Sequence, residues 1–241
     1  MKQTIFITGV GKRIGYALAK HFLALDCNVI GTFRTHYPSI DELLDLGADL
    51  YQCDLCQPAE IDDMLSRIKA QHSQLNCIIH NASDWHNDKT SADITSADIM
   101  ARMMNIHVSA PYQINLALAE LLTASAGTNV GASNIIHITD YVAEKGSKKH
   151  IAYAASKAAL HNMTLSFAAK FAPSVKVNSI APAMILFNEG DDEAYKVKAL
   201  AKAILPKEAG NSEIIELVDY LLASQYVTGR SYAVDGGRHL K

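Results

Sequence analysis

Residues 4–15 read Thr-Ile-Phe-Ile-Thr-Gly-Val-Gly-Lys-Arg-Ile-Gly and join a short apolar run to a glycine-rich turn. The apolar run is rich in β-branched residues and ends at glycines, which predicts a buried strand. Apolar residues then recur with a 3.6-residue period over residues 13–25, which predicts a helix. Glycines between a strand and a helix let backbone N–H groups approach a diphosphate at the helix N-terminus. We therefore assign to a dinucleotide-binding turn the residues Gly9, Lys12, Arg13, Ile14 and Gly15.

The rest of the chain alternates short apolar runs with helical patterns. Helices are predicted over residues 151–171 and over residues 99–122, the latter broken only near Pro111. Alternating strands and helices predict an α/β fold, a doubly wound Rossmann-type seven-stranded parallel sheet with helices on both faces. We expect a single domain over residues 1–241. The six further strands are predicted at residues 27–33, 49–53, 75–80, 133–138, 175–180 and 231–234.

Composition and charge argue against several kinds of partner. A net charge of -3 and a pI near 6.3 give no basic surface for nucleic acid or an anionic membrane. No run of 18 apolar residues and no secretory signal is found, which predicts a cytoplasmic protein. Cys53 and Cys56 form a C-x-x-C pair, but no second pair or histidine cluster accompanies it, so no metal site is expected.

Arg34 follows directly after the second predicted strand. An acidic residue at this point usually binds the ribose of NAD, whereas a basic residue accommodates the 2′-phosphate of NADP. The sequence therefore predicts NADPH as cofactor, with Lys12, Arg13 and His36 as further candidates for the phosphate.

Tyr153 and Lys157 are four residues apart in the predicted helix 151–171, so their side chains share one face. A lysine ammonium beside a tyrosine favours the phenolate and lowers its pKa toward the working range of an acid or base. Asp140 follows the predicted strand 133–138. Since every chemical motif falls at the carboxyl end of a strand, we expect one composite site there.

These motifs together carry a family resemblance. The chain resembles the short-chain dehydrogenase/reductase family over nearly its whole length, and homotetramers are common in that family. The resemblance implies that Lys157 binds the nicotinamide ribose and lowers the pKa of Tyr153. It also implies cofactor contacts from Arg34, Thr35, Asp54, Leu55, Asn81, Ala82, Tyr153 and Pro182. The matching motifs are the turn 8–15, Asp54-Leu55, Asn81-Ala82, Tyr153-x-x-x-Lys157, Pro182, Thr228-Gly229 and residues 235–237.

Within that family the chain is similar to the pteridine reductases in three places. The glycine-rich turn carries Arg13, Asp140 stands thirteen residues before Tyr153, and Asn81-Ala82 continues as Ser-Asp-Trp85. This narrower resemblance implies NADPH-dependent reduction of 7,8-dihydropterins to tetrahydropterins, with weaker reduction of dihydrofolate. Two alternatives stay open: a carbonyl reductase of the same family acting on a 3-oxoacyl or sugar substrate, and a non-catalytic NADP(H)-binding sensor.

The same resemblance suggests substrate contacts. A flat pterin needs polar partners in its plane and an aromatic partner on its face, so Trp85 is expected to stack on it. Ser83 and Arg13 would contact the pterin edge or the cofactor phosphates. Asp140 cannot donate a hydrogen bond unless protonated, so we expect it to share or relay a proton with Tyr153. The proton donor is left open among Tyr153, Asp140 and water.

Two further features are noted without a fixed role. His107 stands where the family carries an asparagine that helps to hold a relay water, whereas Asn105 would face elsewhere on the helix. Residues 184–210 occupy the place of the family's substrate lid.

Overall fold

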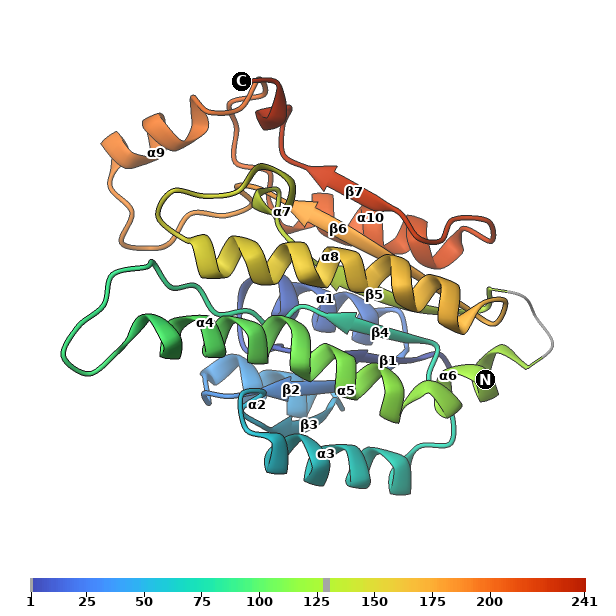
Figure 1. Ribbon diagram of the computed structural model, residues 1–241. Coiled ribbons are helices and arrows are strands. Elements are labelled where there is room, and N and C mark those ends of the chain that lie inside the picture. Colours follow the sequence, from blue (N-terminus) through green and yellow to red (C-terminus); the bar gives the residue numbers. More distant parts are fainter. Residues whose placement is uncertain (1, 128–130) are drawn as a thin grey trace.

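The structure is a computed structural model that describes residues 2–127 and 131–241, with a seven-stranded sheet at its centre (Figure 1). The strand order is β3-β2-β1-β4-β5-β6-β7, and all neighbouring strands pair in parallel. The seven predicted strands and the doubly wound Rossmann-type fold are thus confirmed. The bounds are β1 (Thr4–Ile7), β2 (Asn28–Phe33), β3 (Asp49–Gln52), β4 (Cys77–His80), β5 (Ser133–Ile138), β6 (Val175–Pro182) and β7 (Ser231–Val234).

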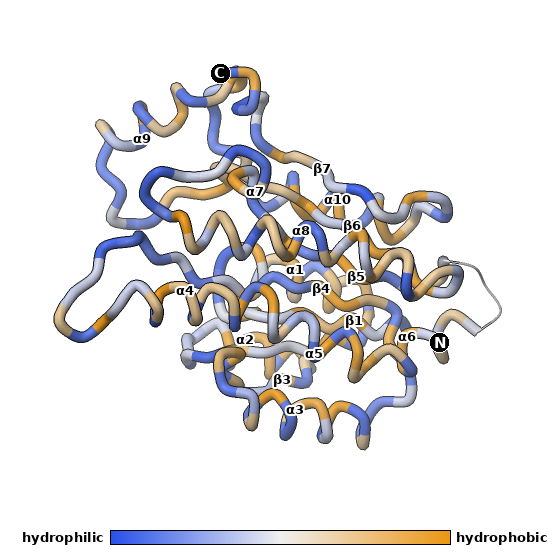
Figure 2. Tube along the Cα trace, viewed as in Figure 1, coloured by the Kyte–Doolittle hydropathy of each residue, from blue (hydrophilic) through white to orange (hydrophobic). Residues whose placement is uncertain are grey.

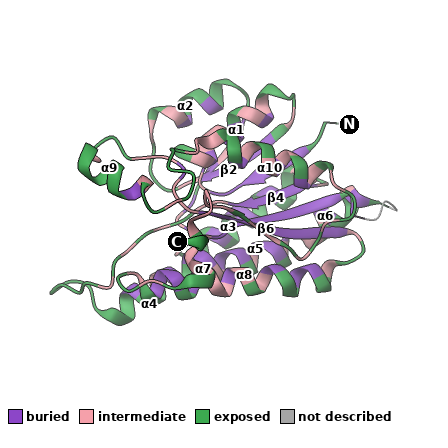
Figure 3. Ribbon diagram, turned by 90° about the horizontal axis from the view of Figure 1, so that it is seen from above, coloured by how far each residue is buried: buried purple, intermediate pink, exposed green. Residues whose placement is uncertain are grey.

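Helices cover both faces of this sheet (Figure 3). One layer holds α1 (Arg13–Ala24), α2 (Pro38–Asp45) and α10 (Asn211–Ala223). The opposite layer holds α3 (Pro58–Gln71), α5 (Ala110–Ala117), α6 (Ala119–Ala126) and α8 (Ile151–Phe171). The remaining helices are α4 (Ser96–Met104), the π-helical turn η1 (Asn105–Ser109), α7 (Val142–Lys145), α9 (Glu193–Leu200) and the short η2 (Arg238–Leu240).

Both faces of the sheet carry clusters of buried apolar side chains, because each face packs against a helical layer. In β1, Phe6 belongs to the core cluster on the side of α3, α5 and α8, while Ile5 and Ile7 belong to the cluster on the side of α1, α2 and α10. Figure 2 shows hydrophobic residues along the strands and a mostly hydrophilic segment between β4 and α4. Among the described residues, no helix combines the length and apolarity needed to cross a membrane.

One local prediction is confirmed only in part. The helical pattern over residues 99–122 is interrupted near Pro111, where it widens into η1, but a second interruption falls at Leu118. Proline lacks an N–H, and its ring clashes with the carbonyl four residues earlier, here that of His107. The wider turn relieves this clash, and the Ala110 N–H bonds to the Asn105 carbonyl instead. This turn places His107 in the interior.

Candidate active site

A cavity of about 680 Å³ lies at the carboxyl ends of the strands, around the point where the strand order reverses between β1 and β4. The predicted composite site is therefore a single open cavity. Most of the predicted residues line it: Gly9, Lys12, Arg13, Ile14, Arg34, Thr35, Asp54, Leu55, Asn81, Ala82, Ser83, Trp85, Asp140, Tyr153, Lys157 and Pro182.

The glycine-rich turn is held against the end of β4. Gly9 has φ +75°, and a Cβ on it would lie 2.9 Å from the Ala82 Cα. The Asn81 amide donates to the carbonyls of Thr8 and Gly9, both at 3.0 Å. Gly15 packs behind the turn and does not line the cavity; a Cβ on it would lie 2.1 Å from the Gly9 oxygen. Its small size is needed to close the turn onto α1.

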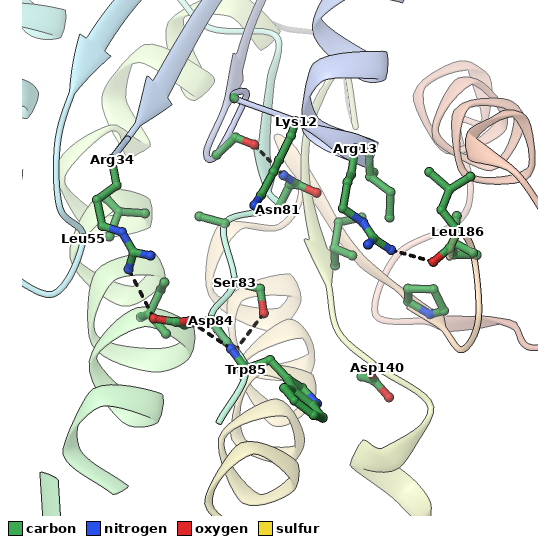
Figure 4. A pocket seen from close by; sticks show the side chains of 18 of the residues that line it. Lys12, Arg13, Arg34, Leu55, Asn81, Ser83, Asp84, Trp85, Asp140 and Leu186 are labelled. Atoms are coloured by element: carbon green, nitrogen blue, oxygen red, sulfur yellow. Dashed lines mark hydrogen bonds and ion pairs between the residues drawn. The ribbon is translucent and has the colours of Figure 1, made fainter. Parts of the chain in front are cut away.

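Arg13 connects the turn to the predicted lid segment. Its backbone has φ +54°, and its guanidinium donates to the Leu186 carbonyl at 2.8 Å and to the Asn188 side chain. Figure 4 shows Arg13 and Lys12 extending from the turn on either side of the space beside Asn81. Lys12 lies 5.1 Å from the centre of the Tyr37 ring. Two positive charges thus flank the turn that is expected to bind phosphate.

Arg34 extends from the end of β2 toward the segment that leaves β4. Its Nη1 lies 3.2 Å from Asp84 Oδ2 (Figure 4), and the same carboxylate pairs with Arg102 Nε at 2.7 Å. Burial raises the pKa of the Asp84 carboxyl, but the hydrogen bonds from Arg102 and Arg34 outweigh it, so this pKa is lowered. Asp84 is therefore charged and orients Arg34 at the cavity wall.

Tyr153, Asp140 and Lys157 meet at the inner part of the cavity. The Tyr153 hydroxyl donates to Asp140 Oδ2 at 2.9 Å, and the Val142 N–H donates to Asp140 Oδ1 at 2.9 Å. Lys157 is buried, donates to the Ile138 carbonyl at 2.9 Å, and lies 5.7 Å from the centre of the Tyr153 ring. Tyr153 and Asp140 are thus hydrogen-bonded to each other, and the buried Lys157 ammonium lies close to the Tyr153 ring.

The electrostatics of this cluster differ from the prediction. Burial, and then the charge of Asp140, raise the pKa of Tyr153 well above its ordinary value, with a smaller opposing effect from the Ser83 hydroxyl. The lowering of this pKa expected from Lys157 is outweighed, first by burial and then by the charge of Asp140. Burial also raises the pKa of Asp140 and lowers that of Lys157 to about 8. Tyr153 therefore keeps its proton at neutral pH.

Trp85 lies at the mouth of the cavity, with 61% of its surface exposed. Its indole packs against the His150 imidazole, with ring centres 4.1 Å apart and planes tilted by 35°. Figure 4 shows the Trp85 ring near Ser83 and Asp140, which line the same cavity as Tyr153.

His107 contacts this cluster from behind. Its Nε2 lies 2.8 Å from the Ser83 hydroxyl and its Nδ1 lies 2.8 Å from the Ser156 hydroxyl. Its ring meets the Tyr153 ring edge to face, with centres 5.4 Å apart. Asn105, by contrast, faces outward and is exposed, as the helical spacing predicts.

Comparison with known proteins places this arrangement in a family. A family model described as enoyl-(acyl carrier protein) reductase matches residues 9–239. The chain belongs to the short-chain dehydrogenase/reductase family. This finding confirms the family resemblance in the sequence.

This short-chain dehydrogenase/reductase has curated relatives with high identity. A dihydromonapterin reductase of Klebsiella pneumoniae is 54% identical over 239 residues, covering 99% of this chain and 98% of the relative. One from Escherichia coli K12 is 53% identical over 237 residues, covering 98% and 97%. A solved structure, FolM alternative dihydrofolate reductase 1 from Brucella canis complexed with NADP, superposes with a TM-score of 0.83. The two sequences are 22% identical, and the superposition covers 99% of this chain and 95% of the Brucella canis chain. This similarity supports the fold.

Sequence reasoning missed part of the site of this short-chain dehydrogenase/reductase. Asp84 lies within the motif 81–85, but its role between Arg34 and Arg102 carries no sequence signal, because Arg102 comes from α4. The contact between Arg13 and Leu186 was equally unpredicted, because it joins residues 173 positions apart.

Proposed function

We propose that this protein reduces the C=N bond of 7,8-dihydropterins with NADPH, giving tetrahydropterins, and reduces dihydrofolate more weakly. The observation that carries the proposal is the 2.9 Å hydrogen bond from Tyr153 to Asp140 at the inner part of the cavity. A protonated tyrosine backed by a carboxylate suits the addition of a proton to a ring nitrogen. The high identity to two dihydromonapterin reductases supports the same substrate class.

The residues that line the cavity suit the chemical groups of NADPH. The turn at Gly9 leaves no room for a Cβ, opens helix α1, and is flanked by Lys12 and Arg13, which suits a diphosphate. Arg34 at the end of β2 suits the 2′-phosphate. We assign to the adenosine and nicotinamide halves Thr35, Asp54, Leu55, Asn81, Ala82, Ile14, Pro182, Tyr153 and Lys157. When bound, NADPH supplies a hydride.

The residues of the chain supply the proton. Hydride addition to the carbon of the C=N bond leaves an electron pair on nitrogen, and the Tyr153 hydroxyl donates its proton there. Asp140, whose pKa is raised by burial, holds or replaces that proton, directly or through water. Lys157 keeps a positive charge beside the pair and offsets the negative charge that remains on it.

The remaining assignments follow from the walls of the cavity. We propose that Trp85 stacks on the pterin and that Ser83 contacts its polar edge. The segment 184–210 acts as a substrate lid, which is supported by the contact of Arg13 with Leu186 and by Asn188 and Tyr195 in the cavity wall. We further propose a single domain over residues 1–241, a homotetramer, and a cytoplasmic location, in line with the family resemblance.

A turnover assay tests this function. The purified protein is mixed with NADPH and either 7,8-dihydromonapterin, 7,8-dihydrobiopterin or dihydrofolate, and NADPH absorbance is followed. We expect fast turnover of a dihydropterin, slower turnover of dihydrofolate, and much slower rates with NADH. The Arg34→Ala variant is expected to raise the KM for NADPH about tenfold, as for loss of one charged hydrogen bond, without raising that for NADH. No turnover of any of the three, with NADPH still bound, would reject the proposal.

A further inference from the structure

His107 is a buried group that the proposed reaction does not use. Only 1% of its surface is exposed, yet both ring nitrogens lie 2.8 Å from serine hydroxyls. One of these hydroxyls, that of Ser83, is on the cavity wall, and the other, that of Ser156, is buried in α8. His107 therefore connects the ligand side of the cavity to the helix that carries Tyr153.

The buried end of this chain of hydrogen bonds, at Ser156, determines which groups donate and which accept. The Ser156 hydroxyl lies 2.8 Å from the Tyr153 carbonyl, and a carbonyl only accepts. The single hydroxyl hydrogen of Ser156 therefore goes to that carbonyl. Its oxygen must then accept from His107, which places a hydrogen on Nδ1.

The charge state of His107 determines the role of its other ring nitrogen, Nε2. Burial, and then the charge of Lys157, lower the pKa of His107 well below its ordinary value, against a smaller effect of a hydrogen bond to the Met103 backbone, so the ring is neutral and has one N–H. With that hydrogen on Nδ1, the Nε2 nitrogen is an acceptor. The Ser83 hydroxyl, 2.8 Å away, then donates to it in preference to the Asp84 carbonyl, which lies 3.4 Å from that hydroxyl.

We infer that His107 is a positioning residue that makes Ser83 a hydrogen-bond acceptor toward the cavity. With its hydrogen directed to the buried imidazole, the exposed Ser83 oxygen presents lone pairs to a ligand. It then selects a ligand that offers an N–H or amino group at this point and disfavours one that offers a carbonyl. This inference rests on the proposed function, since a dihydropterin carries both kinds of group and the contact sets which edge faces Ser83.

The tautomer of His107 is the direct test, and it requires no activity. In nitrogen-15 NMR of the native protein with labelled histidine, His107 is expected to have a protonated Nδ1 and an unprotonated Nε2. The His107→Gln variant assigns its signals, and contacts to the Tyr153 ring assign them independently. A proton on Nε2, or on both nitrogens, at neutral pH would overturn the inference.

A double-mutant cycle tests whether His107 acts through Ser83. The probe is the Kd of 7,8-dihydrobiopterin in the non-reacting complex with NADP⁺. Ser83→Ala is expected to raise this Kd about tenfold, and His107→Phe about threefold, which is the range of one neutral hydrogen bond. In the Ser83→Ala background His107→Phe should have almost no effect, because the group it positions is gone.

Controls separate positioning from general damage. His107→Gln retains one donor and one acceptor and should restore the Kd to within about twofold of the native value. The Kd for NADPH should stay unchanged in all variants. Equal effects of His107→Phe in both backgrounds would refute the inference. If the native protein shows the predicted tautomer but reduces no dihydropterin, the proposed function fails and the hydrogen-bond chain stands. If it reduces dihydropterins but shows the other tautomer, only the inference about His107 is refuted.

Discussion

At the scale of single residues, Asp140 decides the chemistry of the site. It accepts a hydrogen bond from Tyr153, and its charge raises the pKa of that tyrosine. A hydroxyl side chain at this position would offer a donor to a substrate carbonyl, whereas a carboxylate offers a second place for a proton. The pair is therefore arranged to deliver a proton rather than to polarise a ketone.

Replacing this carboxylate gives the first prediction. Asp140→Ser should lower kcat/KM for a dihydropterin by about 100-fold, the usual size of a general acid contribution. The Kd for NADPH, measured by fluorescence titration, should stay within about twofold. Native rates in this variant would remove Asp140 from the mechanism.

Lys157 gives a prediction about pH. Its pKa is lowered to about 8 by burial, partly offset by Asp140, so it is charged below that pH and neutral above it. Because the positive charge supports cofactor binding, kcat/KM for NADPH should be constant near pH 7 and fall about tenfold per pH unit above 8. Steady-state rates from pH 6 to 10 measure this, and a flat profile would contradict it. In Lys157→Arg the guanidinium stays charged, so the fall should disappear.

At the scale of elements, the turn η1 before Pro111 determines where His107 lies. The missing N–H of Pro111 leads to the wider turn, and that turn directs His107 inward between Ser83 and Ser156. The preceding helix α4 begins with a capping box, in which Thr95 and Asp98 satisfy each other's backbone N–H groups. The capping box thus stabilises the start of α4, and Thr95 does not line the cavity.

This cap gives a prediction about stability without activity. Thr95→Ala should lower the free energy of unfolding by about 1 kcal/mol, because the Asp98 N–H loses its acceptor. Urea denaturation measures the change. The control is dihydropterin turnover, which should remain native, since Thr95 does not line the cavity. Unchanged stability would show that the cap is not formed in solution.

At the scale of the whole molecule, the sequence was sufficient for the fold. Short apolar runs such as residues 4–7 predict the strands, and the apolar period of residues 13–25 predicts α1, because each face of the sheet is buried under a layer of helices. The sequence also predicted where most site residues lie, because the carboxyl ends of parallel strands meet at one edge of the sheet.

The sequence did not predict what depends on packing. The raised pKa of Tyr153 comes from burial beside Asp140, which no spacing reveals. The place of Gly15 behind the turn and the link from Arg13 to Leu186 depend on how distant segments meet. Local sequence patterns carry no information on such contacts.

The most direct test of the proposed function follows the hydride. The protein is incubated anaerobically with NADPH deuterated at the transferred position and with 7,8-dihydromonapterin, and the product is analysed by mass spectrometry and proton NMR. We predict a tetrahydropterin with one deuterium on the carbon of the former C=N bond. An unlabelled product, or recovery of the dihydropterin unchanged while NADPH is bound, would contradict the proposed function.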